Sequence, residues 1–65
     1  MTEFPALGSI VRYPLGRETT AEGEVIEVYD GGSGPHVVLR INASGLPEEP
    51  IYTTVSLPLE WISAA

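Results

Sequence analysis

The stretch EGEVIEVYDGGSGPHVVLRI, residues 22–41, contains two runs rich in Val, Ile and Tyr, separated by a cluster of turn-forming residues. β-Branched and aromatic residues favour strands, whereas Gly, Pro, Asp and Ser favour turns. The stretch therefore predicts a β-hairpin with strands over 24–29 and 36–41. The connection between them, residues 30–35, is longer than a two-residue hairpin loop.

The sequence on either side of this hairpin also predicts strands, because no long window keeps the apolar spacing of an amphipathic helix. Gly8 precedes a strand over 9–13, and Pro14 ends it, since proline has no N–H to donate to a neighbouring strand. The expected fold class is all-β, with five strands. The remaining segments are a loop over 14–23, a connection over 42–50, a fourth strand over 51–57, a single 3₁₀ turn over 58–60 and a last strand over 61–63.

Alternation along each strand predicts which side chains face the core, because neighbouring residues of a strand point to opposite sides. The third strand then has Val37, Leu39 and Ile41 inside. The three tyrosines fall on the outer face, and Trp61 is expected to cover the mouth of a barrel. The other predicted core residues are Ile26, Val28, Ile51, Thr53, Val55 and Leu57; the predicted outer residues include Val25, Glu27, Tyr29, His36, Val38, Arg40, Tyr52, Thr54 and Ser56.

Length and charge narrow the possible functions. A chain of 65 residues forms one domain at most and buries only about 60% of its unfolded surface, and it has no cysteine to staple the fold. Nine acidic residues stand against three arginines and no lysine, for a net charge of −6. This charge disfavours nucleic acid and anionic membranes and favours a basic protein partner. We expect an arm over 1–7, a barrel over 8–63 and a tail over 64–65.

Neither an export signal nor a membrane span is predicted, since the first residues lack a positive segment and no apolar run approaches about 18 residues. The expected compartment is the cytoplasm.

Residues suited to catalysis or metal binding are sparse. His36 is the single histidine, and Asp30 across the turn would give two possible ligands, whereas a metal site needs three or four. Glu48 and Glu49 are adjacent in a polar loop and lack the opposed environments that separate the pKa values of a catalytic pair. We therefore expect no catalytic, cofactor or metal site.

Three short motifs resemble the SH3-like barrel superfamily, in its bacterial small-barrel and Tudor-like branch. They are Gly8-Ser9-Ile10-Val11-Arg12, Gly23-Glu24-Val25-Ile26-Glu27-Val28 and Leu57-Pro58-Leu59-Glu60-Trp61-Ile62. The resemblance implies a small barrel whose outer aromatic residues form a binding groove, where acidic neighbours add to the attraction of a cation. The expected function is a non-enzymatic interaction module or accessory subunit. It would bind a basic or proline-containing partner through Tyr13, Tyr29, Tyr52, Glu24 and Glu27.

Other interpretations of the same residues stay open. The tyrosines could simply cover a half-exposed sheet, or Val25, Val38 and Tyr52 could form a seam between two copies of the chain. SH3-like barrels also include a plasmid-borne dihydrofolate reductase whose active site is a pore between subunits. Its Gln-Ile-Tyr pore motif is replaced here by Pro50-Ile51-Tyr52-Thr53, so its activity is not carried over. An accessory subunit of an electron-transfer complex is a third possibility.

Overall fold

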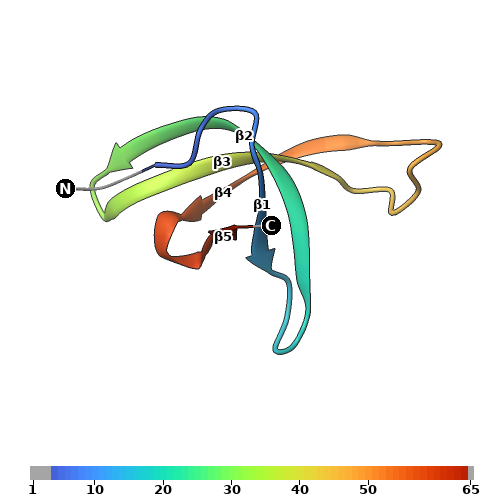
Figure 1. Cartoon of the computed structure of the whole chain (residues 1–65), viewed down its shortest axis with the longest axis horizontal. Helices are drawn as coiled ribbons and strands as arrows, with labels where there is room; N and C mark the ends of the chain where they lie inside the picture. The colour runs from blue at the N-terminus through green and yellow to red at the C-terminus, as the bar shows by residue number, and fades with distance from the viewer. Residues whose placement is uncertain (1–3, 65) are drawn as a thin grey trace.

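The computed structural model describes residues 4–64 of the chain. Within them the chain forms a single antiparallel sheet of five strands, in the spatial order β4-β3-β2-β1-β5 (Figure 1). One short 3₁₀ helix, η1, precedes the last strand. The elements are β1 (Ile10–Pro14), β2 (Thr20–Gly31), β3 (Gly34–Asn42), β4 (Tyr52–Pro58), η1 (Leu59–Trp61) and β5 (Ser63–Ala64).

The prediction of an all-β chain with five strands and one 3₁₀ turn before the last strand is confirmed. Over the described residues, β4 and β5 are the two edge strands and do not pair with each other, so hydrogen bonds do not close the sheet into a barrel. Assignment to the SH3-like superfamily stays a prediction.

Several boundaries differ from the predicted ones. β2 begins at Thr20, so the predicted ten-residue loop shrinks to 15–19, where Leu15 N–H and Gly16 N–H both donate to the Thr19 carbonyl. The β2–β3 hairpin closes through Gly32 and Ser33 alone, because Gly31 already pairs with Gly34. Gly34 has a φ of +113°, which favours glycine.

The end of the chain also differs from the prediction. Trp61 ends η1 instead of starting the last strand. Ala64, predicted as tail, belongs to β5 and pairs with Val11 of β1. Trp61 is 51% exposed, so the expectation that it caps a barrel mouth is wrong. Within the predicted arm, residues 1–3 lie outside the described part, and Phe4 packs against the core.

A β-bulge at Ile26 changes the direction of the side chains along β2. Val25 pairs with Leu39 and Glu27 pairs with Val38, so Ile26 is the extra residue that bends the strand. The backbone groups of Val25 form hydrogen bonds with the segment before β1. Its carbonyl accepts from Gly8 N–H at 2.7 Å, and its N–H donates to the Ser9 carbonyl at 3.0 Å. The predicted faces of β2 were therefore wrong before the bulge and correct after it.

The core lies on the inner face of the curved sheet. Val25, Val37 and Leu39 are fully buried, Val11 is 5% exposed and Tyr13 is 7% exposed. Tyr13 was predicted on the outer face. It points inward because it alternates with Arg12 and shares the inner face of β1 with Val11. The partly buried residues that pack on this core are Phe4, Ala21, Val28, Ile41, Val55, Leu57, Leu59 and Ile62.

Three predicted core residues are exposed instead. Ile26 is 41% exposed because the bulge turns it outward, and Ile51 is 65% exposed because it precedes β4. Thr53 is exposed although it shares the inner parity of β4, since it lies near the end of an edge strand. Val25 makes the opposite exchange, from predicted outer residue to core, so it cannot contribute to a seam between copies.

The lack of a side chain at Gly23 leaves room for the Leu39 and Ile41 side chains of β3 on the inner face of the sheet. A Cβ at this position would lie 3.0 Å from Ile41 Cγ2 and 3.1 Å from Leu39 Cβ. We expect Gly23→Ala to lower the free energy of unfolding by about 1–3 kcal/mol, the usual cost of overpacking a core. Urea denaturation followed by circular dichroism measures the change.

Gly16→Ala is the matched control for this substitution, because a Cβ there meets no atom within 4 Å. It should leave stability unchanged or raise it by about 0.4–1 kcal/mol through the unfolded chain. Equal changes in stability for the two substitutions would contradict the conclusion that close packing excludes a side chain at position 23.

Candidate interaction surface

The outer face of β2, β3 and β4 carries most of the residues predicted to bind a partner. The register sets these side chains in cross-strand rows. Glu24, Arg40 and Thr54 form one row, Glu27, Val38 and Ser56 a second, and Tyr29, His36 and Pro58 a third. The face is polar and aromatic, whereas the opposite side of the same strands forms the core.

Arg40 is held between a carboxylate and an aromatic ring. Its Nη2 donates to Glu24 Oε1 at 2.5 Å, and its guanidinium carbon lies 4.9 Å from the centre of the Tyr52 ring. The two ion-paired side chains are 47% and 33% exposed, so the pair contributes at most about 1 kcal/mol to stability. The pair is nevertheless informative about binding, because it shows that this surface accommodates a guanidinium group.

This cluster lies in a shallow depression of about 210 Å³, which we call the Arg40 depression. Glu22 adds a second carboxylate to its lining. The lining also includes Ile10, Gly23, Glu24, Arg40, Ile41, Asn42 and Tyr52.

The side chain of Asn42 orders the connection that leads to Tyr52. Its Nδ2 donates to the Leu46 carbonyl at 3.0 Å, while its Oδ1 accepts from Ser44 N–H and from Ile51 N–H, each at 3.0 Å. These bonds tie both ends of the 43–51 loop to the end of β3. The start of β4, and with it the Tyr52 ring, is thereby fixed beside Arg40.

Tyr29 forms a separate platform near the hairpin end of the sheet. Its ring stacks on His36 with centroids 5.3 Å apart and an angle of 12° between the planes. The Tyr29 hydroxyl and Ser56 Oγ are hydrogen-bonded at 2.6 Å. His36 Nδ1 donates to the Gly34 carbonyl at 2.8 Å, which fixes the ring orientation. Gly31 permits this arrangement, because a Cβ there would lie 3.2 Å from Tyr29 Cε2.

The structure does not bring the three predicted tyrosines together. Tyr29 is level with residue 36 of β3 and Tyr52 with residue 42, which at roughly 3.3 Å per residue separates them by about 20 Å. Tyr13 lies in the core. A single aromatic groove or cage built from these rings is therefore wrong, whereas Glu24 and Glu27 do lie on the same face as Tyr29 and Tyr52.

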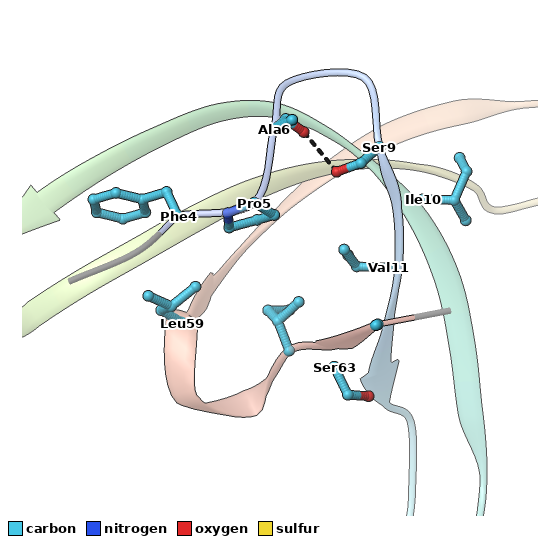
Figure 2. Close-up of a pocket in the computed structure, with 10 residues that line it drawn as sticks. Phe4, Pro5, Ala6, Ser9, Ile10, Val11, Leu59 and Ser63 are labelled. Atoms are coloured by element: carbon cyan, nitrogen blue, oxygen red, sulfur yellow. Dashed lines mark hydrogen bonds between the residues drawn. The ribbon is translucent and has the colours of Figure 1, made fainter.

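An apolar pocket of about 500 Å³ opens on another part of the molecule (Figure 2). The segment before β1 forms one side of it, with Phe4 and Pro5 opposite Leu59 of η1, and Val11 lies at its base. Ser9 Oγ, one of its polar groups, already donates to the Ala6 carbonyl at 2.5 Å. Among the described residues that line the pocket there is no acid, base or metal ligand, so its walls offer mostly apolar contact, with the hydroxyls of Ser9 and Ser63 as polar groups.

Residues 4–64 contain no cluster of three or more side chains able to hold a metal ion. His36 and Asp30 are not cross-strand partners, since His36 pairs with Tyr29 and Asp30 with Pro35. No helix in this part of the chain has the length and apolar character needed to cross a membrane.

Comparison of the chain with protein-family models, with curated proteins and with solved structures finds no match. The choice of this surface as the candidate site therefore rests on the geometry of the structure alone.

Arg40 and Ser56 are two members of this surface that sequence reasoning did not single out. Alternation placed both on the outer face, but their partners depend on the register. The bulge at Ile26 determines which residue of β2 lies opposite Arg40. No local sequence pattern signals that shift.

Proposed function

We propose that this chain is a non-enzymatic protein-interaction module that binds a basic segment of a partner protein on the outer face of β2, β3 and β4. The observation that supports the proposal most directly is the position of Arg40, sandwiched between Glu24 and Tyr52. An arginine or lysine from a partner would meet a carboxylate and an aromatic ring beside Glu22, which lines the same depression as Tyr52, or would take the place of Arg40.

The distribution of charge supports a basic partner. Glu22, Glu24 and Glu27 all come from β2, and among the described residues only Glu24 forms an ion pair. With a net charge of −6, the chain attracts cationic segments and accelerates their approach. The attraction acts over a Debye length of about 8 Å at physiological salt, so binding should weaken as salt rises.

The spacing of the carboxylates suggests the form of the bound segment. Side chains at alternate positions of a strand lie about 7 Å apart on the same face, which is the spacing from Glu22 to Glu24. An extended peptide with basic residues at alternate positions has the same repeat. A proline-rich ligand is less well supported, because Tyr29 and Tyr52 are too far apart to line one groove.

A labelled peptide of alternating arginine and serine tests the proposal by fluorescence anisotropy at low and high salt. We expect Glu22→Gln with Glu27→Gln to weaken binding on the order of tenfold, about 1.4 kcal/mol, because two unpaired carboxylates are lost from the surface. The matched control is Glu48→Gln with Glu49→Gln, which makes the same change in net charge at two loop residues that do not line the Arg40 depression. It should change the dissociation constant less than about twofold.

Equal losses from the two double variants would mean that the peptide responds to total charge and that the outer face is not the binding surface. Absence of binding by the unmodified protein at low salt would also contradict the proposal. Circular dichroism of each variant establishes that the fold is kept.

A further inference from the structure

The open edge of β4 presents backbone hydrogen-bonding groups. Ala43 N–H donates to the Ile51 carbonyl at 2.8 Å, so residue 51 directs its backbone groups toward the β3 side. Because this direction alternates along an antiparallel strand, residues 53, 55 and 57 do the same. Tyr52, Thr54 and Ser56 must therefore direct their N–H and C=O groups away from β3, at the edge of the sheet.

Prolines delimit this edge at both ends. Pro50 and Pro58 have the same parity as Thr54, and neither has an N–H to offer. They lie at equal distances from Thr54 along the chain. The pattern of donors and acceptors on this edge is therefore symmetric about Thr54.

The edge is also free of charge. Residues 50–58 include no Asp, Glu, Lys or Arg, in a chain whose net charge is −6. Tyr52 is 60% exposed, and Thr54 and Ser56 are also exposed. Sheet edges that avoid pairing commonly carry charged side chains, which this one lacks. A second copy of the chain would meet less electrostatic repulsion here than at the carboxylates of β2.

We propose that β4 pairs with β4 of a second copy, antiparallel and centred on Thr54, which joins two five-stranded sheets into one. Thr54 then lies opposite Thr54 of the second copy, and Tyr52 lies opposite Ser56 of that copy. Pro50 faces Pro58 of the second copy across the junction. Because proline has no N–H, this pair leaves no backbone donor without an acceptor. A two-fold axis relates the copies and places both outer faces on the same side of the joined sheet. The pairing is independent of any basic partner.

A cysteine at position 54 tests the register directly, since the chain has no cysteine of its own. Hydrogen-bonded antiparallel partners have Cα atoms about 5.5 Å apart, within the span of about 4.4–6.8 Å that a disulfide needs. We expect Thr54→Cys to form a disulfide-linked dimer under mild oxidation at least about tenfold faster than Thr19→Cys in the exposed 15–19 loop. Equal rates would overturn the proposed register.

The association itself is measured by sedimentation velocity over a range of concentrations. We expect a dimer for the unmodified protein. Thr54→Lys, which places two ammonium groups opposite each other, should weaken that dimer on the order of tenfold. Thr19→Lys makes the same change in net charge and should leave the dimer intact. A monomer at all concentrations, or equal association of the two lysine variants, would overturn the inference.

Discussion

Tyr13→Ala is expected to lower the free energy of unfolding by about 3–5 kcal/mol, as for other large aromatic side chains removed from a core. The Tyr13 side chain is 7% exposed and belongs to the buried cluster formed with Val11, Val25, Val37 and Leu39. A domain of this size has a total stability of roughly 3–10 kcal/mol, so the variant should be partly or wholly unfolded. Far-UV circular dichroism with a urea titration measures the loss.

Two further substitutions show whether the effect comes from burial of the ring. Tyr13→Phe keeps the ring and should cost less than about 1.5 kcal/mol. Tyr52→Ala removes a ring that is 60% exposed and should cost at most about 1 kcal/mol. If Tyr52→Ala were as damaging as Tyr13→Ala, the assignment of the two rings to opposite faces would be contradicted.

Leu39→Ala is expected to have a similarly large effect, a loss of about 2–5 kcal/mol. Leu39 is fully buried on β3, between β2 and β4, and its side chain also lies against Gly23. The strands on both sides leave little freedom to collapse around a cavity, which favours the upper part of this range. The midpoint of urea unfolding should fall sharply, with little change in the slope of the transition.

Leu46→Ala is the control for Leu39→Ala, because it removes the same atoms from a loop residue that is 48% exposed. Its cost should stay below about 1 kcal/mol. Comparable losses at the two positions would indicate that the inner face of β3 is not the centre of the core.

Much of the sheet could be predicted from local patterns. On β3 the alternation of Val37 and Leu39 with His36, Val38 and Arg40 identified the core side, and Val55 and Leu57 did so on β4. On β2 the same reasoning failed at Val25 and Ile26, because a bulge inserts one residue and reverses the alternation. A run of apolar and acidic residues contains no local signal for such an insertion.

The candidate site was only partly predictable for a related reason. Glu27, Tyr29 and Tyr52 share the outer face, as alternation suggested. Glu24 lies there too, because the bulge at Ile26 reverses the alternation of β2. Which of them meet is decided by the register between strands distant in sequence, and this register separates Tyr29 from Tyr52. The amphipathic ring of Tyr13 suits either face of a sheet. The informative feature was its position two residues after Val11, which places both side chains on the same face of β1.

The unequal pairing of the strands has a consequence for the order of folding. The β2–β3 hairpin closes through two residues, so its loop-closure entropy is small and it can form within microseconds. Among the described residues, the junction of β1 with β5 joins segments far apart in the chain through two residue pairs, Val11 with Ala64 and Arg12 with Ser63. This long-range junction should therefore assemble late, and fraying under destabilising conditions should begin there while the central hairpin persists.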